Sequence, residues 1–175
     1  TNMPAAPDHF ARCSEINRRG PAVVADLPPL EAWEPATFAR EAKAKNALVL
    51  DIRSYEAFGG RHVPGSVALD TGGNFSTFAG WILPPQNDIL LVAEDRARAM
   101  EASVSLRRVG IDRLKGFLDG GVFAWSKAGF PSDSVAQVSV HELVAMIRRK
   151  ERLTLVDVRS ANEFANGHIE GAVNI

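Results

Sequence analysis

Short apolar runs alternate along this chain with segments whose apolar residues recur at helical spacing. The runs at 47–52, 88–93 and 153–158 have the length of a strand and are continuously apolar, which is typical of strands buried on both faces of a parallel sheet. Helical spacing is found at 10–18, 36–45, 75–83, 99–109 and 140–150. This alternation predicts an α/β fold in which helices cover both faces of a mainly parallel sheet of about five strands.

Local signals sharpen several boundaries of these elements. Pro35 suits the first turn of the helix at 36–45, and Ser54 can cap a short helix that runs through Phe58. A further apolar piece at 114–118 is followed by Gly120-Gly121 and a helical stretch that includes Trp125. Between the strand at 88–93 and the helix at 99–109, the polar residues 94–98 form a short loop. In an open parallel sheet such a loop lies at the carboxyl ends of the strands, where binding and catalytic groups gather.

The sequence contains an internal repeat. Seven of the 21 positions from 49 to 69 are identical to those found 106 positions later, without a gap. The identical pairs include Asp51 with Asp157, Arg53 with Arg159 and His62 with His168. A fixed offset of this size indicates two copies of one structural unit, and the second copy reaches Ile175 before its counterpart of the 88–93 strand.

These motifs resemble the rhodanese (sulfurtransferase) domain family. Both copies match D-x-R-S-x-x-x-F-x-x-x-H-[IV]-x-G-[AS]-V, which is close to the signature of the first half of a rhodanese domain. The region 88–125 has the order of the second half, namely strand, loop, helix, short strand and a final helix that begins GG-x-x-AW. The resemblance implies a rhodanese-like fold over 31–133 and the first half of a second, truncated domain over 134–175.

In the family, the strand before the loop ends in a nucleophilic cysteine, and the loop ends in an arginine. Matching that arginine to Arg98 puts Ala93 at the nucleophile position, so the resemblance implies that no catalytic residue is present. The degenerate loop consists of Ala93, Glu94, Asp95, Arg96, Ala97 and Arg98. Sulfur transfer needs a thiolate, which a methyl group cannot replace, and two carboxylates oppose an anionic sulfur donor. Arg96 and Arg98 could hold an anion, but pairing with nearby charges is the favoured interpretation.

The first 30 residues are rich in proline and have little apolar patterning, which predicts a linker around one short helix. The words PDHFARCSEINRRGPA resemble the tail that follows the metallo-β-lactamase fold in bacterial proteins that fuse such a hydrolase to rhodanese domains. The H-x-H-x-D-H metal signature of that hydrolase is absent. An upstream metallo-β-lactamase-fold domain is therefore an expected partner, together with the rest of the second rhodanese repeat.

Composition narrows the function classes. The formal net charge of −1 gives no basic excess for nucleic acid, and no apolar run is long enough to span a membrane. No signal-peptide pattern is present either, so a cytoplasmic protein is expected. Cys13 is the single cysteine, which excludes an internal disulfide and a cysteine zinc site. We expect no cofactor and no metal.

Other chemistry-bearing residues receive structural interpretations. The Asp51–Arg53 and Asp157–Arg159 pairs are expected to fix loop geometry, with general acid–base catalysis as the alternative. His62 and His168 are expected to make a structural hydrogen bond. The remaining expectations are surface positions for His9 and His141, packing roles for Trp33, Trp81 and Trp125, and an incidental or buried thiol for Cys13 rather than a sulfur relay.

Two functions follow from the resemblance. One is a rhodanese-like, non-catalytic domain of a sulfur-metabolism protein, which as a whole would be a sulfurtransferase or a metallo-β-lactamase-fold hydrolase such as a persulfide dioxygenase. The other is an interaction, dimerisation or domain-spacing module, with a homodimer as its simplest form. A cysteine at the second copy's equivalent of Ala93 would favour the first function.

Overall fold

The computed structural model describes residues 9–20, 23 and 27–175. It contains two compact units, Thr1–Ala136 and Gln137–Ile175, which we call unit 1 and unit 2. Part of the N-terminal linker prediction falls on residues 1–8, 21–22 and 24–26, which lie outside the described residues.

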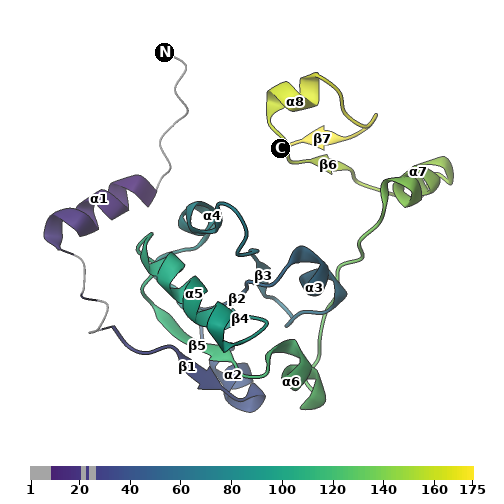
Figure 1. Cartoon of the computed structure of the whole chain (residues 1–175). Coiled ribbons are helices and arrows are strands. Elements are labelled where there is room, and N and C mark those ends of the chain that lie inside the picture. Colours follow the sequence, from purple (N-terminus) through teal and green to yellow (C-terminus); the bar gives the residue numbers. More distant parts are fainter. Residues whose placement is uncertain (1–8, 21–22, 24–26) are drawn as a thin grey trace. The chain divides into compact units, whose positions relative to one another are not determined.

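Unit 1 is built around a sheet of five parallel strands (Figure 1). The strands are β1 (Glu31–Trp33), β2 (Ala47–Asp51), β3 (Val67–Ala68), β4 (Asp88–Val92) and β5 (Leu114–Leu118), in the spatial order β1-β5-β4-β2-β3. The predicted fold class is confirmed. Strand β1 was not predicted, because three residues are too short to show a pattern. Its place beside β5 depends on a contact between distant residues, since the ring of Trp33 packs over Gly116 of β5.

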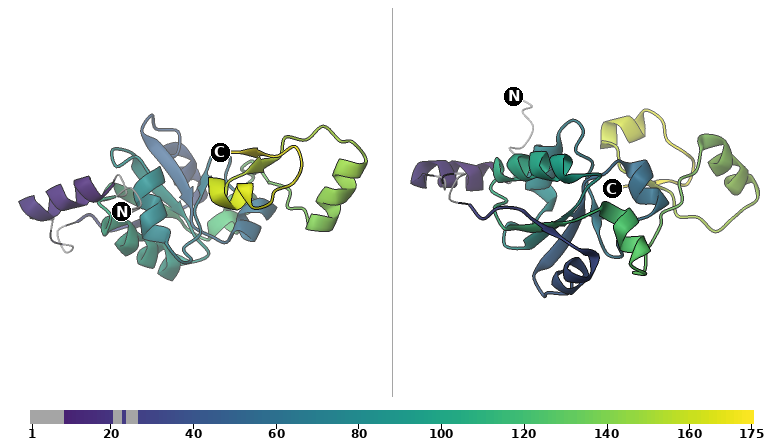
Figure 2. Two further views of the ribbon diagram at one scale, coloured as in Figure 1. Left: turned by 90° about the horizontal axis from the view of Figure 1, so that it is seen from above. Right: turned by 60° about the horizontal axis from the view of Figure 1, so that its bottom comes forward.

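Helices cover both faces of this sheet, as Figure 2 shows. The helices after β1 are α2 (Pro35–Glu41), α3 (Tyr55–Gly60), α4 (Phe75–Ile82), α5 (Arg96–Arg107) and α6 (Gly121–Lys127). Helices α4 and α5 bury their apolar residues against one face, with Leu50, Ile52 and Leu91. Helices α2 and α6 pack on the other face, against Val49, Leu90 and Val92. Successive residues of β2 and β4 thus alternate between two cores.

Two helix boundaries differ from the prediction. Helix α2 ends at Glu41, four residues before the expected end, and the chain turns through Ala42–Ala44 towards β2. Helix α5 begins at Arg96, three residues early, because Asp95 caps it. Polar residues at 96–98 were interpreted as loop, but an aspartate followed by Arg-Ala-Arg is itself a helix-start signal.

The N-terminal helix α1 (His9–Arg19) confirms the helix expected within the linker, but it is part of unit 1 and packs against α4 and the end of α5. Arg12 donates a hydrogen bond from Nη2 to the Val109 carbonyl at 2.8 Å. His9 is buried rather than on the surface as predicted, because Gly80 of α4 leaves room for its ring; a Cβ there would lie 2.6 Å from it. A single histidine without patterned neighbours gave no sign of this contact in the sequence.

Unit 2 contains α7 (Val140–Arg148), β6 (Val156–Asp157), α8 (Ala161–Ala165) and β7 (Val173–Asn174). Strands β6 and β7 form a parallel pair. The predicted strand at 153–158 is reduced to two residues, because within the described residues of unit 2 only β7 pairs with it. None of the residues of its two helices is buried.

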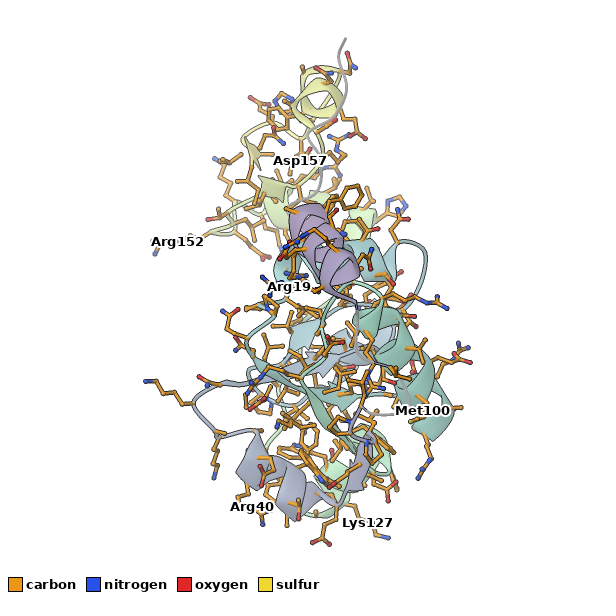
Figure 3. All side chains as sticks on the ribbon, turned by 90° about the vertical axis from the view of Figure 1, so that its left-hand side faces the viewer. Arg19, Arg40, Met100, Lys127, Arg152 and Asp157 are labelled. Atoms are coloured by element: carbon orange, nitrogen blue, oxygen red, sulfur yellow. The ribbon has the colours of Figure 1, made fainter. Side chains whose placement is uncertain are left out.

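The outer surface of unit 1 carries several large apolar side chains. Met100 points outward from α5 (Figure 3), and Trp81 of α4 is also exposed, which makes the packing role expected for Trp81 wrong. Trp125 is buried as predicted, beneath Phe130, and donates a hydrogen bond to the Pro131 carbonyl at 2.7 Å. No helix among the described residues is long and apolar enough to cross a membrane.

Candidate functional site

The candidate site lies at the carboxyl end of β4, the central strand of the sheet. Ala93 directly follows this strand and is buried against the apolar core beneath α4 and α5. Gly121, at the start of α6, approaches so closely that a Cβ there would lie 3.0 Å from the Ala93 carbonyl oxygen. The predicted nucleophile position is therefore at the expected place in the fold, but it presents a methyl group.

The loop after Ala93 supplies the residue that caps the N-terminus of α5. The side chain of Asp95 accepts a hydrogen bond at Oδ1 from the Arg98 backbone N–H at 2.9 Å. The N-terminus of a helix attracts anions because its first N–H groups lack partners and its dipole is positive there. Here the carboxylate of Asp95 already occupies that position. From the sequence, Asp95 was interpreted only as a charge that repels an anionic donor, and its capping role was not predicted.

The two arginines of the loop do not converge on Ala93. Arg98 donates a hydrogen bond to Glu101 one turn along α5, at 3.1 Å, so the local pairing expected for it is present. Its side chain lines a cavity of about 350 Å³ between the start of α4 and α5, and Ala93 is not part of that lining. The side chains of Arg96 and Glu94 are exposed and make no hydrogen bond or ion pair with the described part of the chain. The six loop residues follow one another at the end of β4, but their two arginine side chains do not form an anion-binding cluster at Ala93.

Next to this loop, Asp51 and Arg53 form the expected structural pair. Asp51 is fully buried and receives two guanidinium hydrogen bonds, at 2.9 Å to Oδ1 and 2.6 Å to Oδ2. The same guanidinium donates to the Arg61 carbonyl at 2.8 Å, which ties the end of β2 to the end of α3. With both carboxylate oxygens engaged, Asp51 is held as a structural anchor.

His62 also has a structural position. Its ring stacks on Phe58 with centroids 3.9 Å apart, and Nδ1 lies 2.9 Å from the Phe58 carbonyl oxygen. A carbonyl only accepts hydrogen bonds, so Nδ1 carries the hydrogen. The structural hydrogen bond expected for this histidine is confirmed.

Unit 2 repeats these contacts at the equivalent residues. Arg159 pairs with Asp157 and donates to the Gly167 carbonyl at 2.9 Å, and His168 Nδ1 lies 2.9 Å from the Phe164 carbonyl oxygen. Hydrogen bonds from the Arg159 side chain and backbone N–H lower the pKa of Asp157 to about 2. The difference from unit 1 is exposure: the side chain of Arg159 is 46% exposed, whereas that of Arg53 is 11% exposed.

A model of the rhodanese-like domain family matches residues 34–128 and 139–175. The chain belongs to this family. The match at 34–128 covers unit 1 from α2 to α6, including strands β2 to β5 and the loop at Ala93, and begins directly after β1. The match at 139–175 covers all helices and strands of unit 2.

Solved structures agree with this fold. A rhodanese-like domain from Anabaena sp. superposes with a TM-score of 0.53 at 20% identity, over 63% of this chain and 89% of its own. A metallo-β-lactamase from Staphylococcus aureus has a TM-score of 0.53 at 26% identity, over 67% of this chain but only 32% of its own. An anaerobic ergothioneine biosynthesis enzyme from Chlorobium limicola has a TM-score of 0.53 at 16% identity, over 84% of this chain and 41% of its own. No curated protein matches the sequence significantly.

The remaining candidates of this rhodanese-like chain form no second site. Cys13 lies half-buried on α1 and packs against the core of unit 1. Among the residues described by the structure, no group of three or more His, Cys, Asp or Glu side chains could hold a metal ion.

Proposed function

We propose that unit 1 is a non-catalytic rhodanese-like domain of a sulfur-metabolism protein that handles persulfide or thiosulfate sulfur. One observation carries this proposal: the residue at the end of β4 is Ala93, and the helix start that would stabilise a thiolate there is occupied by Asp95. Sulfur transfer requires a thiolate that attacks the sulfane sulfur and carries it as a persulfide. The loop after β4 has neither a thiol nor a vacant anion site.

The proposed role in sulfur metabolism rests on the similarity of this chain to other proteins. The Chlorobium limicola enzyme shares the fold over 84% of this chain, and the Staphylococcus aureus metallo-β-lactamase matches over 67% of it. In the proposed architecture, an upstream metallo-β-lactamase-fold domain precedes residues 1–30, and unit 2 begins a second rhodanese-like domain. The whole protein would then be a sulfurtransferase or a metallo-β-lactamase-fold hydrolase such as a persulfide dioxygenase, acting in the cytoplasm.

The direct test is a sulfurtransferase assay on the purified chain with thiosulfate as donor and cyanide as acceptor. We expect no turnover above background, and the same result for Cys13→Ala. Turnover that persists in Cys13→Ala would overturn the proposal, because no other thiol is present. Turnover that disappears in Cys13→Ala would show instead that Cys13 carries sulfur.

A gain-of-function series separates the two obstacles in the loop. Ala93→Cys restores a thiol, but Asp95 still satisfies the helix start and adds negative charge, so alkylation of the thiol near neutral pH should be slow. Adding Asp95→Gly to Ala93→Cys removes the carboxylate, which should lower the pKa of the new thiol by about one unit. The thiolate fraction near neutral pH, and with it the alkylation rate, should then rise about tenfold. Equal rates in the two variants would show that Asp95 does not control this site.

The alternative is that unit 1 is purely an interaction, dimerisation or domain-spacing module. The exposed side chains of Phe78, Trp81 and Ile82 on α4 favour it, since clustered large apolar residues often mark contact surfaces. Trp81→Glu should change the oligomeric state or the stability of the full-length protein under this alternative. It should leave both unchanged if the surface of α4 makes no contact.

A further inference from the structure

A polar cavity between α4 and α5 has no role in the proposed function of unit 1. The two helices lie side by side on one face of the sheet (Figure 1). The cavity has a volume of about 350 Å³, which is within the usual range for small-molecule sites. Residues of the segment 71–77 and one face of α5 line it, and Ala93 is not part of the lining.

Contacts within unit 1 hold the walls of this cavity in place. Ser76 of α4 donates a hydrogen bond from Oγ to the Ser105 carbonyl of α5 at 3.2 Å. Phe75 and Ala102, which also line the cavity, are buried in the core beneath the two helices. The cavity is therefore part of the packed fold and is formed before any ligand binds.

The side chains around the cavity can donate more hydrogen bonds than unit 1 accepts from them. The side chains of Thr71, Asn74 and Thr77 make no hydrogen bond with the described part of the chain. Each carries a hydroxyl or an amide group that can donate. Among the described residues of the lining, Glu101 is the one acidic side chain. Such a set of donors suits a ligand that is rich in oxygen acceptors.

The cavity also has one positive charge without a counter-charge. Arg98 and Arg108 both line it, and Arg98 donates a hydrogen bond to Glu101 at 3.1 Å. The guanidinium of Arg108 makes no hydrogen bond or ion pair with the described part of the chain. A guanidinium can donate two parallel hydrogen bonds to a phosphate or a carboxylate. Arg108 is therefore the group in the lining that is available to an anion.

The number of donors favours a phosphate over a carboxylate. A carboxylate has two oxygen atoms, which the guanidinium of Arg108 can bind by itself. A phosphate monoester has three terminal oxygens, so donors from the segment 71–77 can bind those that the guanidinium leaves free. The cavity has room for about ten water molecules at about 30 Å³ each, so a bare phosphate ion would leave most of it empty.

We propose that the cavity between α4 and α5 binds a small phosphorylated molecule, with its phosphate at Arg108 and its hydroxyl groups next to Glu101. The hydroxyl and amide donors of the segment 71–77 complete the phosphate contacts. This inference goes beyond the proposed function and does not depend on it, since neither Ala93 nor Asp95 lines the cavity.

The test titrates the full chain with glycerol 3-phosphate at low ionic strength and follows the backbone amides by NMR. We expect saturable shifts at residues 71–77 and 105–108, with one ligand bound per chain. Arg108→Gln should weaken binding about tenfold or more, because the charge-assisted hydrogen bonds are lost. Arg96→Gln is the matched control, since Arg96 is also exposed and unpaired on α5 but lies outside the lining. It should change the affinity by less than about twofold.

Further comparisons test the chemistry of the ligand and of the donors. Inorganic phosphate should bind about tenfold more weakly than glycerol 3-phosphate, because it lacks the hydroxyl groups that reach Glu101. Glycerol, which has no charge, should not bind. Thr77→Val keeps the size of the side chain but removes its hydroxyl, and it should weaken binding of glycerol 3-phosphate about threefold or more.

Three results would overturn the inference. Absence of saturable shifts at 71–77 would show that the cavity binds no phosphate ester. Equal losses in Arg96→Gln and Arg108→Gln would assign the binding to the general positive charge of α5. Inorganic phosphate that binds as tightly as the ester would show an ion site without an organic ligand. None of these results depends on sulfurtransferase activity, so they are separable from a failure of the proposed function.

Discussion

Residues 51–69 and 157–175 adopt one local structure in two different surroundings. Each segment has a strand that ends in an Asp-x-Arg pair, a short helix capped by serine, a histidine stacked on phenylalanine and a second parallel strand. The first segment is buried by β4 and the helices of unit 1, whereas the second remains open. The comparison shows that short-range sequence determines these hydrogen bonds, and that the neighbouring strand determines burial.

The largest difference is expected at the two aspartates. Asp51→Asn leaves the nearly buried guanidinium of Arg53 without its counter-charge, which should lower the free energy of unfolding of unit 1 by about 3–5 kcal/mol. Asp157→Asn, at the more exposed pair, should cost unit 2 much less than Asp51→Asn costs unit 1. Urea unfolding followed by tryptophan fluorescence reports on unit 1, and amide exchange at 173–175 reports on unit 2. Similar losses in both units would show that unit 2 is buried in solution.

The next matched pair removes apolar side chains at equivalent positions. Ile52→Ala deletes buried atoms from the core beneath α4 and α5 and should cost about 2–5 kcal/mol of unfolding free energy. Val158→Ala removes atoms that are already in water and should change stability by less than about 0.5 kcal/mol. The same two measurements apply. A cost above about 1 kcal/mol for Val158→Ala would contradict an open β6.

A smaller difference is expected at the histidines. His62→Ala removes a hydrogen bond and a stacked ring contact in a buried position, with an expected cost of about 1–2 kcal/mol. His168→Ala removes the same contacts from an exposed position and should cost well under about 1 kcal/mol. His62→Gln is the control, because its amide can donate to the Phe58 carbonyl without restoring the ring. If Gln recovers the whole loss, the stacking contributes nothing.

The sequence was informative where a pattern extends over several residues. Continuous apolar runs predicted β2 and β4, the repeated Asp-x-Arg motif predicted the pairs that both units contain, and Ser54 was predicted to cap α3. It was uninformative where one contact between distant segments decides the outcome. Burial of His9 depends on the space left by Gly80, and β1 depends on the packing of Trp33 over Gly116. The apolar pattern at 153–158 predicted a longer strand than β6. Strand length also depends on a neighbouring strand to pair with, which the pattern of one segment does not reveal.

The smallest expected effect is a pH dependence confined to unit 2. The pKa of Asp157 is lowered from 3.8 to about 2 by hydrogen bonds from Arg159. Because the folded state holds this proton less tightly than the unfolded state, the pair stabilises unit 2 above about pH 4, and the contribution is lost as the pH falls towards 2. Amide exchange at 173–175 should therefore accelerate below pH 4, relative to the intrinsic rate. A carbon-detected NMR titration of the Asp157 carboxyl gives the midpoint directly. Arg159→Gln should move that midpoint up towards 3.8; a parent midpoint already at 3.8 would show that the exposed pair does not persist in solution, unlike its buried counterpart at Asp51.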